Sequence, residues 1–160
     1  MEDRSGRRRP ARRDLDDLGG RSSIVYVTVC TAKRRSILDH NYIHELLVEE
    51  AWPKANHWMV GRYGLMPDHI HLFCSPSVEN AVTVKRWVAY WKSYASNHWP
   101  TRTKRPIWQQ DCWDRQLRSG ESYDEKWAYV KENPVRHGLV ESAKDWPYQG
   151  ELHVLDWHDG

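Results

Sequence analysis

Residues 66–74 limit the fold more than any other part of the chain, because they join a turn to a strand whose two faces differ. The segment reads Met-Pro-Asp-His-Ile-His-Leu-Phe-Cys. Successive side chains of an extended strand point to opposite faces, so Ile70 and Leu72 face a core. His69 and His71 then lie side by side on the other face, where two imidazoles can bind one divalent ion together. A pair of strand histidines without a ligand fits the pattern equally well, because short motifs also arise by chance.

The remaining pattern predicts one α+β domain around this strand. Alternating and β-branched segments predict strands over 21–31, 58–65, 69–74 and 107–117. Apolar residues at helical spacing predict helices over 39–54, 82–97 and 119–131. This order is typical of a split βαβ, ferredoxin-like antiparallel sheet with helices on one face, plus a C-terminal helix. The histidines are expected on the face that the helices leave uncovered.

Polar residues mark where the first and last helices are expected to begin. Asp39 or Asn41 is expected to cap the first helix, and Ser119 or Ser122 the last. An Asn-Pro pair at residues 133–134 is expected to interrupt the last helix. No periodic pattern follows residue 144, so no element is predicted there.

The aromatic composition is unusual for a chain of 160 residues, a length that suits one domain with a core. Ten Trp and eight Tyr stand against one Phe. Large rings fill cores and also stack on nucleobases, and composition does not decide between these uses. The three cysteines are far apart and form neither a disulfide framework nor a Cys-x-x-Cys zinc motif, which favours the reducing cytoplasm. No apolar run reaches membrane-spanning length, so no membrane partner is expected.

Positive charge is concentrated at the N-terminus. Residues 1–13 carry six Arg against two acidic residues, a net +4, which leaves −2 for the rest of a chain whose formal charge is +2. A basic segment without periodicity predicts a disordered arm, which we place at residues 1–20. Its arginines, among them Arg7, Arg8 and Arg9, can contact phosphates without reading base sequence. A tail that serves only solubility explains the composition equally well.

A longer motif lies towards the C-terminus. Residues 129–140 read Tyr-Val-Lys-Glu-Asn-Pro-Val-Arg-His-Gly-Leu-Val. They closely resemble the YIxxNPVxxGLV segment of the REP-associated tyrosine transposases, relatives of the single-tyrosine insertion-sequence transposases. Residues 64–72 resemble the HUH motif of these enzymes, two histidines around a bulky hydrophobic residue, and residues 107–118 also look like the family. We expect a basic arm at residues 1–20. An HUH transposase-like catalytic domain is expected at 21–150, followed by a tail at 151–160.

The resemblance implies covalent chemistry on DNA. Tyr129 would attack a phosphorus of single-stranded DNA, leave a 5′-phosphotyrosine and free a 3′-hydroxyl, and a second 3′-hydroxyl could then join strands without external energy. An ordinary phenol, with a pKa of about 10, is a poor nucleophile at neutral pH, so a metal would assist it. The resemblance implies Mg²⁺ or Mn²⁺ at His69 and His71, and imidazoles favour Mn²⁺. The third ligand is expected four residues after the tyrosine, on the same helix face, which here is Asn133, a neutral and weaker donor.

The implied substrate is hairpin DNA from repetitive extragenic palindromes (REP elements) with a short single-stranded flank. Exposed Trp side chains could stack on its bases, and five cations in and after the loop that follows residue 98 could hold its backbone: Arg102, Lys104, Arg105, Arg115 and Arg118. Lys85 lies off the apolar face of the second predicted helix, where a solvated surface is a stronger alternative than a phosphate contact. We expect a monomer or a weak dimer.

Two other functions fit parts of the pattern. A replication-initiator-like nickase would use the same chemistry at a fixed origin. A non-catalytic module that binds single-stranded nucleic acid would need neither the histidine pair nor the tyrosine, so their presence favours an enzyme. The other tyrosines of the helices, Tyr90, Tyr94 and Tyr123, are expected to pack rather than react.

Overall fold

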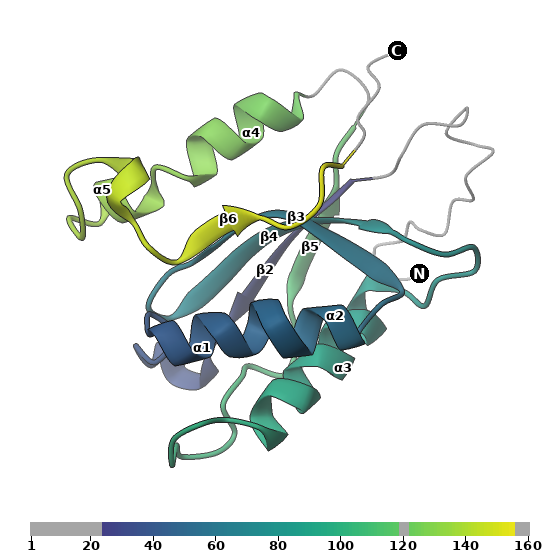
Figure 1. Ribbon diagram of the computed structural model, residues 1–160, viewed down its shortest axis with the longest axis horizontal. Coiled ribbons are helices and arrows are strands. Elements are labelled where there is room, and N and C mark those ends of the chain that lie inside the picture. The colour runs from purple at the N-terminus through teal and green to yellow at the C-terminus, as the bar shows by residue number, and fades with distance from the viewer. Residues whose placement is uncertain (1–23, 119–121, 156–160) are drawn as a thin grey trace.

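A five-stranded antiparallel sheet forms the centre of the molecule, seen in a computed structural model that describes residues 24–118 and 122–155 (Figure 1). Its strands are β2 (Val25–Cys30), β3 (Trp58–Leu65), β4 (His69–Pro76), β5 (Trp113–Gln116) and β6 (Gln149–Glu151). The spatial order is β5-β2-β4-β3-β6, and every neighbouring pair is antiparallel. The first four strands therefore adopt the ferredoxin-like order predicted from the sequence, with β2 and β4 in the interior.

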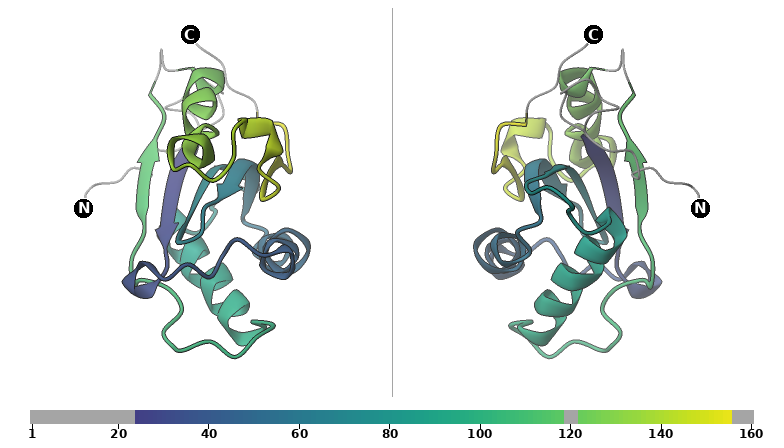
Figure 2. Two further views of the ribbon diagram at one scale, coloured as in Figure 1. Left: turned by 90° about the vertical axis from the view of Figure 1, so that its left-hand side faces the viewer. Right: turned by 90° about the vertical axis from the view of Figure 1, so that its right-hand side faces the viewer.

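Helices α1 to α3 cover one face of the sheet (Figures 1 and 2). The first helical segment consists of α1 (Asn41–Glu45), a π-helical stretch (Leu46–Ala51) and α2 (Trp52–Lys54), and α3 spans Val84–Asn97. The larger core lies between these helices and the sheet, and four tryptophans meet in it edge to face: Trp52, Trp87, Trp91 and Trp108. Much of the unusual Trp content therefore fills the core. The predicted cap is wrong, because α1 begins after His40, which makes no side-chain capping bond.

Two further helices lie across the other face of the sheet, α4 (Tyr123–Val130) and α5 (Asn133–Arg136) (Figures 1 and 2). The prediction that this face stays uncovered is wrong. Phe73 follows His71 on the same face of β4 and packs against Tyr123, with 5.0 Å between the ring centroids. Val130 joins them in a second, smaller core. The apolar residue after the two histidines requires a cover, and α4 supplies it.

The sheet has a fifth strand that the sequence pattern did not reveal. β6 pairs with β3 over Gln149 to Glu151 and so forms one edge of the sheet. A single 3-10 turn (Ala143–Asp145) precedes it, and the indole of Trp146 donates to the carbonyl of Leu65 at 2.8 Å. A three-residue strand is too short to show an alternating pattern, which explains why it was missed.

The predicted strand over 107–117 is shorter than expected. Only β5 pairs along β2, and Trp108 forms an isolated bridge with Thr31. Between Trp108 and β5 the backbone carbonyls point to α3. Lys92 of α3 donates to the carbonyl of Gln109 at 2.9 Å, and Lys85 donates to that of Cys112 at 2.9 Å. Carbonyls bound by lysines replace part of the strand ladder here.

Some predicted segments fall outside the described residues. They are the basic arm over 1–20, with its arginines, and the last five residues of the predicted tail. Residues 21–23 of the first predicted strand and 119–121 of the last predicted helix, with the cap candidate Ser119, also lie outside the described residues. Within the two described ranges, no helix combines the length and the apolar character needed to cross a membrane.

Ser122 caps α4 and is one of the two residues predicted to do so. Its hydroxyl oxygen accepts a bond from the backbone N–H of Glu125 at 3.1 Å. We expect Ser122→Ala to lower the free energy of unfolding by about 1 kcal/mol, since it leaves a helix N-terminal donor without its acceptor. Urea denaturation measures the change. Ser142 is a matched control, because it precedes a 3-10 turn without making a side-chain cap bond, and equal losses for both variants would contradict the capping role.

Candidate active site

The two histidines of β4 form the centre of the site. β4 pairs with β2 on one side and with β3 on the other, so its backbone is fixed within the sheet. Ile70 and Leu72 are fully buried in the larger core, and His69 and His71 point to the opposite face, as the alternation predicted. The Nε2 atoms of the two histidines lie 2.9 Å apart, with the rings inclined at 85°.

Each imidazole is held at its other ring nitrogen. Nδ1 of His69 lies 2.7 Å from a carboxylate oxygen of Asp68, and Nδ1 of His71 lies 2.7 Å from the hydroxyl of Tyr26. When each Nδ1–H donates to these oxygens, both Nε2 atoms carry lone pairs that face each other. In this tautomer both lone pairs are available to one cation. An oxygen partner on the outer nitrogen is also the usual support of a metal-binding histidine.

Burial keeps both imidazoles neutral. Burial lowers the pKa of His71 to about 3, and the charges of His69 and Arg136 add to the fall. Burial also lowers the pKa of His69, although Asp68 opposes the shift. A neutral imidazole is the form that binds a metal. The predicted open setting is wrong, since His69 is only 9% exposed.

Arg34 places a second charge beside Asp68. It ends a 3-10 turn (Ala32–Arg34) in which Lys33 and Arg34 have φ of 57° and 53°. Positive φ is uncommon outside glycine, so this turn is strained at the edge of the site. Nε of Arg34 lies 3.1 Å from Asp68. Burial would raise the pKa of Asp68, but its bonds to His69 and Arg34 outweigh burial and lower it, so the carboxylate stays charged.

Asn133, the first residue of α5, contacts the histidine pair from above the sheet. α4 ends at Val130 and α5 begins at Asn133. The helix is therefore interrupted, as predicted, but at Lys131 and Glu132, and the Asn-Pro pair forms the first turn of α5. Nδ2 of Asn133 lies 2.8 Å from Nε2 of His71, and its Oδ1 accepts a bond from Arg136 at 2.9 Å. The amide therefore presents its nitrogen to the pair. Its oxygen would face the histidines only after a half-turn that gives up the bond to Arg136.

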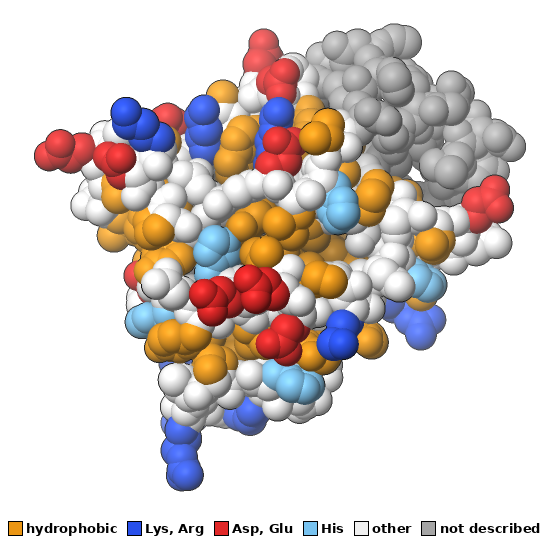
Figure 3. Space-filling view, viewed as in Figure 1, with side chains coloured by type: hydrophobic (Ala, Val, Ile, Leu, Met, Phe, Trp, Pro, Cys, Tyr) orange, Lys and Arg blue, Asp and Glu red, His pale blue; other side chains and the backbone are white. Residues whose placement is uncertain are grey.

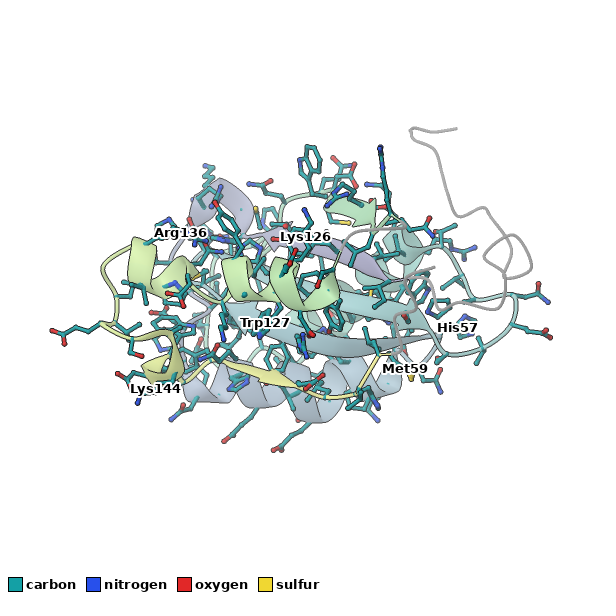
Figure 4. All side chains as sticks on the ribbon, turned by 90° about the horizontal axis from the view of Figure 1, so that it is seen from above. His57, Met59, Lys126, Trp127, Arg136 and Lys144 are labelled. Carbon is teal, nitrogen blue, oxygen red and sulfur yellow. The ribbon has the colours of Figure 1, made fainter. Side chains whose placement is uncertain are left out.

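Tyr129 lies in the last turn of α4 and is 68% exposed. The guanidinium of Arg136 lies over its ring, 4.1 Å from the centroid, and Figure 4 shows Arg136 beyond the C-terminal end of α4. Burial is the main cause that raises the pKa of Tyr26, and Tyr129 is close enough to add to the rise. Through Arg136, which also donates to Oδ1 of Asn133, Tyr129 is connected to the residue that contacts His71.

Tyr123 and Tyr94 have structural partners, as expected, whereas Tyr90 is exposed and the expectation that it packs is wrong. Tyr123 is 6% exposed, its hydroxyl accepts a bond from the backbone N–H of Arg62 at 2.9 Å, and burial raises its pKa to about 12. Tyr90 and Tyr94 belong to α3, on the opposite face of the sheet, where Tyr94 donates to Glu50 at 3.0 Å. Among these tyrosines, only Tyr129 combines exposure with a place near the histidines.

The predicted DNA-binding cations are divided between two sides of the molecule. The loop with Arg102, Lys104 and Arg105 lies on the opposite side of the sheet from α4 (Figure 1), and Figure 3 shows Lys and Arg side chains both near α4 and at the lower tip. Lys85 forms ion pairs with Asp111 and Asp114 at 2.8 and 3.4 Å, so it has a structural use. The remaining candidates are Arg115 on β5, Arg118 just after it, and Arg7, Arg8 and Arg9, which lie outside the described residues. Their roles on DNA stay predictions.

Sequence reasoning did not single out three residues of the site. Asp68 directly precedes His69, so its position in the motif could have revealed it. Tyr26 alternates with Val25 and Val27 in β2, but only the strand register places it opposite Phe73 and next to His71. Arg34 follows from no pattern, because it depends on the left-handed turn after β2.

The sheet, the histidine pair and the tyrosine of α4 place this chain in a class of transposases. It belongs to the family described as "Transposase IS200 like", whose model matches residues 21–132, more than half of the chain. Two curated relatives are REP-associated tyrosine transposases by name. The Haemophilus influenzae protein is 29% identical over 112 aligned positions, which cover 58% of this chain and 62% of the relative. The Escherichia coli K12 protein is 25% identical over 111 positions, which cover 65% and 62%.

A solved structure shares the fold. It is described as a REP-associated tyrosine transposase bound to a REP hairpin, and it matches with a TM-score of 0.63 and 21% identity over 81% of this chain and 76% of that chain. The resemblance drawn from the two motifs is confirmed, as is the α+β fold class. This chain spans less than two thirds of the length of the two curated relatives.

Proposed function

We propose that this chain is a metal-dependent endonuclease and strand transferase that acts on single-stranded hairpin DNA of the REP type. The observation that carries the proposal is the meeting of two distant motifs on one face of the sheet. The histidine pair of β4 and the segment from Tyr129 to Arg136 are about sixty residues apart in sequence, yet Asn133 lies 2.8 Å from His71. The relatives' names and the REP hairpin in the neighbouring structure support the choice of substrate.

The donor set fits a divalent metal ion. Two imidazole nitrogens bound to one ion at a right angle, with bonds of about 2.1 Å, would lie about 3.0 Å apart, and the observed Nε2 separation is 2.9 Å. Right angles suit the octahedral coordination of Mg²⁺ and Mn²⁺, and imidazole favours Mn²⁺. In the described residues no third His, Cys, Asp or Glu completes a cluster. The further protein donor would be Oδ1 of Asn133, which faces the histidines only after the half-turn that gives up its bond to Arg136. Bound there, the ion would polarise a phosphate oxygen and offset its developing charge.

Tyr129 supplies the nucleophile in this proposal. Its hydroxyl oxygen forms a bond to the phosphorus, and the bond from phosphorus to the 3′-oxygen breaks. The phenol loses a proton and the released 3′-oxygen takes one up, so the step is balanced. The phosphoryl group stays on Tyr129 as a 5′-phosphotyrosine, which a different 3′-hydroxyl can attack to join two strands. The exposed position of Tyr129 suits this role, because a DNA strand can reach it.

Arg136 positions the two functional residues of α4 and α5, Tyr129 and Asn133. Its guanidinium lies over the ring of Tyr129 and donates to Asn133. A planar guanidinium can stack and donate at once, whereas the ammonium of a lysine cannot. The tyrosine is therefore held in register with the residue that approaches the histidines.

A covalent capture assay tests the proposal. A labelled hairpin oligonucleotide with a single-stranded flank is incubated with the protein and Mn²⁺, and the products are separated under denaturing conditions. The proposal expects a protein–DNA band that survives denaturation and a fragment with a free 3′-hydroxyl. Cleavage without any covalent band would instead indicate water as the nucleophile.

Tyr26 should tune the metal site without belonging to it. Tyr26→Phe keeps the ring but removes the hydroxyl that lies 2.7 Å from Nδ1 of His71. We expect the affinity for Mn²⁺ to fall about 10- to 100-fold, the usual effect of losing a partner that orients a metal-binding histidine. Titration of the DNA-free protein with Mn²⁺ measures the change. An unchanged affinity would show that the hydroxyl does not orient His71.

A further inference from the structure

Trp113 differs from the other tryptophans of the chain. It is 77% exposed, whereas the other tryptophans in the described ranges are buried or half-buried. It belongs to β5, the edge strand of the sheet, whose backbone pairs with β2. A rigid strand therefore presents a large ring to solvent.

The strand register places Trp113 on the same face as the active site. Trp113 is directly opposite Thr28, and Thr28 is directly opposite His71. Residues directly opposite in antiparallel strands share a face, and the hydroxyl of Thr28 lies 3.5 Å from Nδ1 of His71. Asp114 points the other way and pairs with Lys85 of α3 at 3.4 Å, which agrees with this assignment.

The row from His71 to Trp113 crosses two strand spacings, so the backbones of these residues are about 10 Å apart. The only residue between them in the row is Thr28, whose small side chain projects little from the sheet. Arg115 lies on the same face, opposite Tyr26, and is close enough to lower the pKa of that tyrosine. A positive charge beside an exposed ring is the combination that holds the phosphates and bases of a single strand.

We propose that Trp113 is a stacking site for a nucleobase of the DNA strand whose phosphate lies at the histidine pair, with Arg115 facing the adjoining backbone phosphate. This proposal rests on the proposed function and adds a subsite to it. The strand would run across the sheet from β4 towards β5. Stacking accepts any base, because every base has a π-face, so the subsite anchors the strand without reading its sequence.

Removal of the ring tests the subsite by equilibrium binding. The probe is a fluorescein-labelled oligothymidylate of about fifteen nucleotides, compared with an abasic strand of the same length. Trp113→Ala should weaken binding of the oligothymidylate about 5- to 100-fold, the range for loss of one base–aromatic stack, and leave binding of the abasic strand unchanged. Trp113→Phe should restore most of the affinity, since it returns an aromatic face.

Tyr90→Ala is the matched control. Tyr90 is also an exposed aromatic residue, at 53%, but it lies on α3 on the other face of the sheet, so its loss should change neither probe. Unchanged binding of oligothymidylate by Trp113→Ala, or equal losses for both probes, would overturn the proposal. The measurement involves no cleavage, so a wild-type protein that forms no covalent band would contradict the proposed function while leaving this result intact.

Discussion

Tyr129→Phe is expected to form no covalent adduct with hairpin DNA and to leave the strand uncut, while binding it about as tightly as the wild type. The substitution removes one oxygen from a ring that is 68% exposed, so packing changes little. The Arg136 guanidinium can still lie over the Phe ring, because this contact uses the face of the ring rather than the hydroxyl. The only chemical loss is then the attacking atom. Denaturing gels with DNA labelled on either side of the cut measure the result.

Tyr123→Phe is the matched control for this experiment. Both tyrosines belong to α4, but the Tyr123 hydroxyl accepts a bond from the backbone of Arg62 within the smaller core. Its loss should lower the free energy of unfolding by about 1 kcal/mol and leave the adduct in place. Mass mapping of the modified peptide should find the phosphoryl group on Tyr129. A phosphotyrosine at Tyr123, or cutting by Tyr129→Phe, would move this chain to ordinary metal-dependent nucleases.

The parts of the site that the sequence could predict are those set by local pattern. Alternation along β4 puts His69 and His71 on one face whatever the neighbouring strands are, because the side-chain period of a strand is two. The Asn-Pro pair marks the interruption because proline lacks the N–H that a helix interior needs but is tolerated in a first turn, so the chain breaks at Lys131 and Glu132 and a new helix, α5, begins at Asn133. The first four strands followed from hydrophobic segments and their order, which short connections restrict to few topologies.

The rest depends on pairings between residues that are distant in sequence. Tyr26 meets His71 only because β2 pairs with β4 in one register out of several, and a slip of one residue would turn it to the core. The cover of α4 over Phe73 is likewise a tertiary contact. The expectation of an uncovered face came from treating each helix as part of one layer. A single apolar residue, Phe73, argued against that view.

The assignment of the metal site can be tested in the absence of DNA. Mn²⁺ in excess should raise the melting temperature of the wild type, because a ligand that binds only the folded state stabilises it, by about 2.7 kcal/mol at a hundred times its Kd. The ion would bind both Nε2 atoms, which already lie 2.9 Å apart, so little rearrangement of the histidines is needed. His69→Ala and His71→Ala each remove one donor, and neither variant should respond to Mn²⁺.

Cleavage by these variants should fall by more than about 100-fold. That is the upper limit for losing a residue that only orients a metal ligand, and here the ligand itself is lost. Their free energy of unfolding without metal should fall by about 1 to 3 kcal/mol, because each substitution leaves a hydrogen-bond partner of a buried imidazole unpaired. His98→Ala is the matched control, as His98 lies at the end of α3 and stacks on Tyr94 at 4.0 Å, away from the pair. It should keep the full response to Mn²⁺. If the double substitution of His69 and His71 still melts higher with Mn²⁺ and still cuts DNA, the metal site lies elsewhere and the neutral histidine pair serves only the packing under α4 and α5.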